Sequence, residues 1–171
     1  MGTAGSLEKG IVSLTGASAA IEYTVHMHEN GIADPGMRMC YIGDLPVIAI
    51  CRVIPLILFD NRVFLTEQAR GHVEEVHSDT FLEYLPMLSD LVSHPTYVGL
   101  YEKKEFALQL VTPLVLRGEH ALVAIDLHTM RDPSMRNTIS SFYNLDAPSF
   151  ESRVKSSRLR PIPYLTVDKF L

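Results

Sequence analysis

"LVSHPTYVGLYEKKEFALQLV", residues 91–111, contains the change of pattern that decides the fold. Upstream of it, apolar residues recur at helical spacing, in the stripe formed by Phe81, Leu85, Leu88 and Val92. Downstream, short runs with strand character alternate with polar breaks such as "EKK". Helices collected ahead of consecutive strands predict an α+β fold, in which N-terminal helices pack on an antiparallel β-sheet meander.

The same pattern predicts most elements from residue 66 onwards. The expected strands lie at 96–101, 105–111, 120–127 and 138–145, followed by a short helix at 147–157 and an extended tail at 160–164. Ahead of them, Thr66 is expected to cap a helix that runs to residue 77. A second helical segment restarts at Ser78, is kinked or divided by Pro86, and is closed by Pro95.

The first third of the chain is expected to hold one helix and several strands. These elements are a helix at 15–31, strands at 37–43 and 46–54, and a hairpin at 56–65 with its bend at Asp60-Asn61. The apolar run at 45–59 is shorter than the ~20 residues that a membrane helix needs. Its β-branched content indicates a buried strand instead.

Size and composition are those of a globular domain. The chain has 171 residues, of which 47% are hydrophobic and 20% are charged, so one domain is expected and no disulfide or metal is needed to hold it together. Cys40 and Cys51 are expected to be reduced thiols, which indicates a cytoplasmic protein. No signal peptide is visible in the opening "MGTAGSLEKG".

Charge is unevenly distributed along the chain. Residues 1–126 carry 8 Lys and Arg against 16 Asp and Glu, whereas residues 127–171 carry 7 against 4. The net charge of −5 argues against a general nucleic-acid binder. A basic end on an acidic body nevertheless suits a phosphate substrate.

"RGHVEEVH", residues 70–77, gathers two histidines, an arginine and two glutamates. His72 and His77 are five residues apart, which is a turn of about 140° on a helix, so their side chains do not share a face. A zinc-binding helix needs histidines at i and i+4. The spacing therefore indicates no metal pair, and each histidine is either a solvated surface residue or a catalytic one. Phosphate-binding loops and nucleophile elbows are absent from the sequence.

"NTISSFY", residues 137–143, is the second stretch that bears on function. On a strand, Ser141 and Tyr143 point to one face with Ile139 beside them, and Ser140 and Phe142 point to the other. A half-exposed strand accounts for this pattern without any function. Hydroxyls close to guanidinium groups would instead suit a phosphodiester. The helix and tail that follow supply such groups and a lysine, at Arg153, Lys155, Arg158 and Arg160.

The order of these pieces resembles the superfamily of barnase, EndoU, colicin-type and RelE-like nucleases, in particular its phage- and polymorphic-toxin-associated branches. The pieces are a helix with "H-V-x-x-x-H", the segment "LPMLSDLVSHPTYVGLY", three strands, "S-S-F-Y" and a basic helix. The resemblance implies a nuclease core over residues 63–171. Residues 1–62 are then an N-terminal region of unknown role, packed on the core or continuous with it.

The resemblance implies RNA cleavage without a metal or cofactor, by attack of a ribose 2′-OH on the adjacent phosphate to leave a 2′,3′-cyclic phosphate. Such a reaction needs a base, an acid and a cation beside the phosphate, and the ordinary histidine pKa of ~6.5 suits both proton roles. By resemblance, His72 is the catalytic histidine and His77 its alternate, while Ser141 and Tyr143 bind phosphate or orient the base. The basic candidates for substrate binding are Arg70, Arg131, Arg136, Arg153 and Lys155, with Arg153 chosen as the cation from charge alone.

Two hypotheses follow. The first is a toxin-type, metal-independent endoribonuclease that acts on tRNA or mRNA in the cytoplasm of the producing or target cell. It leaves room for an immunity or antitoxin protein, involves no membrane, and has His72 facing Tyr143 across a cleft between helix and sheet. The second is a catalytically inactive protein-binding module with the same fold. The acidic first 126 residues favour it, as does Asp126, which stands where many relatives carry lysine or arginine.

Overall fold

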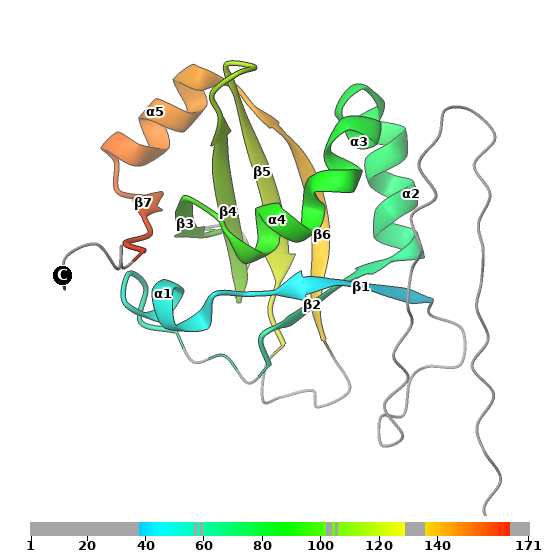
Figure 1. The fold of residues 1–171 in the computed structure, drawn as a ribbon, viewed down its shortest axis with the longest axis horizontal. Coiled ribbons are helices and arrows are strands. Elements are labelled where there is room, and N and C mark those ends of the chain that lie inside the picture. The colour runs from blue at the N-terminus through cyan, green and yellow to red at the C-terminus, as the bar shows by residue number, and fades with distance from the viewer. Residues whose placement is uncertain are drawn as a thin grey trace, which may run out of the picture.

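The computed structural model describes residues 38–56, 58, 60–101, 104, 106–128 and 136–164. Within these residues, seven strands form one sheet in the order β1-β2-β6-β5-β4-β3-β7. The strands are β1 (Met39–Asp44), β2 (Arg62–Thr66), β3 (Tyr97–Leu100), β4 (Ala107–Leu114), β5 (Glu119–Asp126), β6 (Asn137–Leu145) and β7 (Arg160–Pro161). The helices are α1 (Val47–Cys51), α2 (Glu67–Val76), α3 (Ser78–Tyr84), α4 (Leu88–Ser93) and α5 (Ala147–Lys155), with a 3-10 helix at Leu85–Met87. The expected α+β class is confirmed (Figure 1).

The meander predicted from the change of pattern is present. Strands β3, β4, β5 and β6 are neighbours in chain order, and each adjacent pair is antiparallel. The sheet as a whole is mixed, because β2 adds to β6 in parallel, with Val63 opposite Asn137 and Leu65 opposite Ile139. Beyond β2 lies β1, and beyond β3 lies β7, each antiparallel to its neighbour.

Separate apolar clusters cover the two faces of the sheet. On one face, which we call the helical face, residues of α2, α3 and α4 such as Phe81 and Val92 share a core with the strands. Figure 1 shows α4 crossing in front of the strands and α2 with α3 beside β6. On the other face, which we call the α5 face, Phe150 of α5 packs with the cluster that contains Val111 and Leu122.

Local signals fix the helices beside β6. Thr66 caps α2 as expected, since its Oγ1 accepts a hydrogen bond from the backbone N–H of Ala69 at 3.1 Å. His77 ends α2, and its carbonyl oxygen accepts hydrogen bonds from the N–H groups of Thr80 and Phe81 as α3 begins. Pro86 lies in the 3-10 helix between α3 and α4, so the predicted division at this proline is confirmed.

Two expectations for the N-terminal third are wrong. Residues 46–54 hold helix α1 instead of a strand, and within it Ile50 is buried whereas Ile48 is largely exposed. The β-branched residues here follow tertiary packing, which outweighs β propensity. The expected hairpin at 56–65 is also wrong, because β2 is paired with β1 on one side and with β6 on the other, which leaves no place for another strand. The helix expected at 15–31 lies outside the described residues.

Strand β6 contains one more residue than β5 across their shared ladder. Ala124 pairs with Ser141 and Ile125 pairs with Ile139, so Ser140 has no partner residue and forms a β-bulge. Its hydroxyl donates a hydrogen bond to the carbonyl oxygen of Ala124 at 3.3 Å. The strand therefore changes the face to which its side chains point at this residue.

The bulge sorts the side chains of β6 between the two faces. Ile139 and Phe142 both lie in the core of the helical face. Ser141 and Tyr143 point to the α5 face, because residues paired directly across strands share a face and Tyr143 is opposite Leu122. The expectation that Ile139 lies beside Ser141 and Tyr143 is wrong, because it assumed unbroken alternation along the strand.

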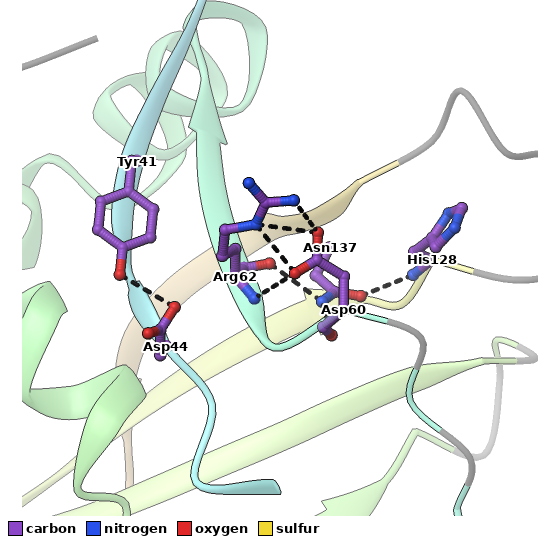
Figure 2. A network of polar contacts seen from close by, with 6 residues as sticks. All are labelled: Tyr41, Asp44, Asp60, Arg62, His128 and Asn137. Atoms are coloured by element: carbon purple, nitrogen blue, oxygen red, sulfur yellow. Dashed lines mark hydrogen bonds and ion pairs between the residues drawn. The ribbon is translucent and has the colours of Figure 1, made fainter. Parts of the chain in front are cut away.

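A buried asparagine holds the start of β6. Asn137 is 1% exposed, and its Nδ2 donates hydrogen bonds to the carbonyl oxygens of Asp60 at 2.7 Å and Arg62 at 3.0 Å. Its Oδ1 accepts a hydrogen bond from the backbone N–H of His128 at 2.8 Å. Figure 2 shows this network together with the Arg62 guanidinium, whose Nη2 donates to Asp60 Oδ2 at 2.8 Å. The beginnings of β2 and β6 and the end of β5 therefore meet at one point.

Asp60→Asn should destabilise the fold in a pH-dependent way. Burial acts to raise the pKa of Asp60, but the hydrogen bonds and charge of Arg62 outweigh it and hold the pKa below its ordinary value. Such a group stabilises the fold above its unfolded pKa of about 3.9, and the contribution is lost as the pH falls through the lower folded value. Urea unfolding should show a gap between wild type and variant from pH 7 to about 5 that closes below about pH 4. A gap that persists unchanged into acid would contradict this role of the carboxylate.

Gly99→Ala should also destabilise the fold. A Cβ added to Gly99 in β3 would overlap the carbonyl oxygen of Arg158, in the chain that follows α5. Backbone atoms yield at a cost, so we expect a loss of about 1–3 kcal/mol in the free energy of unfolding.

Gly71→Ala is the matched control, because a Cβ at this position in α2 meets nothing within 4 Å. Removing a glycine from the middle of a helix should raise stability by about 0.5–1 kcal/mol. Urea unfolding compares the two variants. Equal stability of Gly99→Ala and wild type would show that the segment around Arg158 moves away freely.

Candidate active site

Strand pairing lines up a row of residues on the α5 face. Gly99, Gln109, Ala124 and Ser141 are paired in turn across β3, β4, β5 and β6. Neighbouring strands are about 4.8 Å apart, so Gln109 and Ser141 stand about 10 Å apart with the small side chain of Ala124 between them. The row therefore has polar side chains at Gln109 and Ser141, with only the small side chain of Ala124 between them.

The guanidinium of Arg153 is held at the Gln109 end of this row. Gln109 is only 7% exposed, and its Oε1 accepts a hydrogen bond from Nη1 of Arg153 at 2.7 Å. Arg153 is half-buried and lies in the last turn of α5. Because a hydrogen bond from a charged donor is strong, Gln109 fixes the guanidinium beside the row. Neither the position of Gln109 nor this contact was predicted from the sequence, although a glutamine within the apolar run "ALQLV" was a visible signal.

A stacked pair of rings lies next to this row, at Tyr143, two residues beyond Ser141 on β6. The rings of His77 and Tyr143 have centroids 5.0 Å apart and planes inclined by 24°. β2 pairs with β6 only as far as Ile139, and α2 and α3 contact β6. His77, at the junction of these two helices, is thereby brought to Tyr143. Tyr143 and Ser141 are both half-buried.

The structure distinguishes the two histidines of the helix. His72 is exposed on α2, next to the buried Val73. The ring that meets Tyr143 is that of His77, five residues later. The sequence predicted that His72 faces Tyr143. In the structure the histidine ring that stacks on Tyr143 is that of His77.

The remaining basic candidates are spread over the molecule. The guanidinium carbon of Arg70 lies 6.0 Å from the ring centroid of Phe81, which belongs to the helical face. Arg136 precedes β6, and its charge helps to lower the pKa of Asp60. It is seven residues from Tyr143, roughly 20 Å along an extended strand.

Two further candidates lie on or beyond the last part of the fold. Lys155 is exposed and follows Arg153 by two residues, which places it on nearly the opposite side of α5. Arg131 lies outside the described residues.

An ion pair also lies on the α5 face and was not predicted. Asp126 pairs with Ala107 and Thr138, in the row next to that of Ala124 and Ser141. Its Oδ2 accepts a hydrogen bond from Nζ of Lys104. Its Oδ1 is buried and has no hydrogen-bond partner among the residues that the structure describes. Lys104 belongs to the "EKK" segment, which the sequence identified only as a polar break between strands.

The described ranges hold no group of three or more His, Cys, Asp and Glu side chains that could bind a metal ion. Cys40 and Cys51 are free thiols, as expected. No helix in the described part of the chain is long and apolar enough to cross a membrane. Comparisons with protein-family models, curated proteins and solved structures give no match to this chain.

Proposed function

We propose that the protein is a metal-independent endoribonuclease with its active site on the α5 face, around Ser141 and Tyr143. The observation that carries the proposal is the presence of a histidine, two hydroxyls and a fixed guanidinium on or beside the α5 face. Ser141 and Gln109, which fixes Arg153, share the row of Ala124. The Tyr143 ring that stacks on His77 lies in the adjacent row, opposite Leu122. Cleavage of RNA through its own 2′-OH needs a base, donors to the phosphate and a cation. The resemblance of the motif order to the barnase, EndoU, colicin-type and RelE-like nucleases supports the same chemistry.

In this proposal His77 is the base. It takes the proton from the 2′-OH, the new bond forms between that oxygen and phosphorus, and the bond to the 5′-oxygen breaks. The products are a 2′,3′-cyclic phosphate and a 5′-hydroxyl that is protonated from solvent. The stacked ring of Tyr143 sets the plane of the imidazole, and its face stabilises the imidazolium that forms.

The phosphate is held by Ser141 and Arg153. The hydroxyl donates to one phosphate oxygen, and the guanidinium offsets the charge that accumulates on the phosphorane. Because Gln109 already fixes the guanidinium, little reorganisation is needed when the charge develops. His77 takes the place that the sequence assigned first to His72.

The biological role in this proposal is that of a toxin. Its substrate is tRNA or mRNA in the cytoplasm of the producing or target cell. A producing cell would then need an immunity or antitoxin protein as a partner.

A protein-binding module without activity is the second candidate. Asp126 favours it, because a carboxylate on the α5 face repels the phosphate that an active site must attract. The net charge of −5 acts in the same direction. Wild-type protein that neither cleaves nor binds RNA would favour this candidate.

His77→Ala should reduce cleavage by about 10²–10⁴-fold, as expected for loss of a general base. His72→Ala is the matched control and should cleave RNA nearly as well as wild type. Tyr143→Phe keeps the ring stack but removes one of the two hydroxyls of the site, so its rate should lie between those of the two histidine variants. The measurement is the rate of oligoribonucleotide cleavage in EDTA, with mapping of cyclic-phosphate ends and thermal melting to confirm folding. If His72→Ala were the inactive variant, His77 would not be the base.

Arg153→Met should lower kcat by about 10²–10³-fold, because it removes the charge that stabilises the phosphorane. Lys155→Met, which removes an equal charge from the far side of α5, should have little effect. Cleavage rates at saturating oligoribonucleotide measure both. Equal losses in the two variants would mean that the helix contributes only diffuse charge.

A further inference from the structure

Asp126 is an unfavourable residue for its place in the fold. Its side chain is 23% exposed, yet Oδ1 is buried and finds no hydrogen-bond partner within the described ranges. Strands disfavour aspartate, and a buried oxygen that lacks a donor loses its hydration without compensation. An ion pair with a half-exposed lysine returns at most about 1 kcal/mol. The pair of Asp126 and Lys104 is therefore poorly explained by stability.

The location of the pair points to a function. Asp126 and Ser141 lie on the same face in adjacent rows, which are about 7 Å apart along a strand. Lys104, from the connection between β3 and β4, is 53% exposed and reaches Asp126 there. An ammonium group carries three donors, so the contact with Asp126 Oδ2 leaves two for another acceptor.

We infer that Lys104, positioned by Asp126, binds a second phosphate of the RNA strand, next to the scissile phosphate at Ser141 and Arg153. The inference rests on the proposed function for the position of the scissile phosphate. It also accounts for an acidic residue on an anion-binding face, because Asp126 acts on the substrate through the lysine that it holds. The substrate is then single-stranded RNA that runs across the rows of the α5 face.

The test measures binding of a short 2′-O-methyl oligonucleotide, which has no free 2′-OH and is not cleaved by the proposed reaction. Fluorescence anisotropy over a series of salt concentrations gives the slope of log K against log salt. Lys104→Met should weaken binding and reduce the magnitude of this slope by about 0.7, the value for one phosphate contact on a single strand. Lys104→Arg should retain the wild-type slope.

Arg117→Met is the matched control. Arg117 is a half-exposed cation paired with Glu83 at 2.9 Å, beyond the other end of β5. Its loss changes the net charge by the same amount and should leave the slope unchanged. Equal slopes for Lys104→Met and wild type, or equal changes in Lys104→Met and Arg117→Met, would overturn the inference.

The melting temperature of Asp126→Asn distinguishes a pair that serves binding from a pair that only stabilises the fold. If Asp126 serves binding, the variant should melt at or above the wild-type temperature, because the buried Oδ1 no longer belongs to a charged group. A clear drop in melting temperature for Asp126→Asn, with an unchanged slope for Lys104→Met, would make the pair a structural contact. A wild type that binds the probe but cleaves no RNA would remove the ribonuclease proposal and leave the phosphate contact intact.

Discussion

The extra residue at Ser140 is the constraint on which both the core and the candidate site depend. Strict alternation along β6 would place Ile139 with Ser141 and Tyr143 on one face and Phe142 on the other. The bulge instead sends Ile139 and Phe142 into the helical face and leaves the two hydroxyls on the α5 face. A shift of one residue moves the following side chains to the opposite face of the sheet. This one inserted residue thus puts the apolar side chains of β6 in the core and the hydroxyls of the candidate site on the other face.

The position of His77 follows from where β2 stops. The Asn137 network ties the beginnings of β2 and β6 together, and their parallel pairing ends at Ile139 (Figure 2). Thr66 then starts α2 at once, so helices instead of a further strand run beside the rest of β6. The junction of α2 and α3 consequently reaches the α5 face at Tyr143. A longer β2 would have kept the histidine away from the hydroxyls.

Sequence patterns predict the elements wherever one period runs without interruption, as in β3, β4 and β5 and the helices divided at Pro86. In β6 they predict the strand but not the bulge at Ser140. They fail at 46–54, where tertiary packing outweighs β propensity. They fail at 56–65 because β2 lies between β1 and β6, and no local pattern contains its pairing with β6, more than seventy residues later. The site is predictable to the same extent. Ser141 and Tyr143 follow from alternation, but the choice between His72 and His77 depends on where β2 ends. The roles proposed for Gln109 and Lys104 require the register of four strands.

In the proposed ribonuclease, RNA would be attracted by a few cations on the α5 face and not by the charge of the whole protein. With a net charge of −5, the whole protein repels a polyanion at long range. Arg153 and Lys104 are each held by a partner on the sheet, so in the proposed complex they would lose less freedom on binding phosphate than unrestrained side chains would. Few phosphate contacts also imply a weak dependence of affinity on salt. Such a surface would select RNA by the fit of a few fixed groups. The buried Gln109 and the half-buried Asp126 are polar residues within an otherwise apolar sheet, and such exceptions to core packing are expected at functional sites.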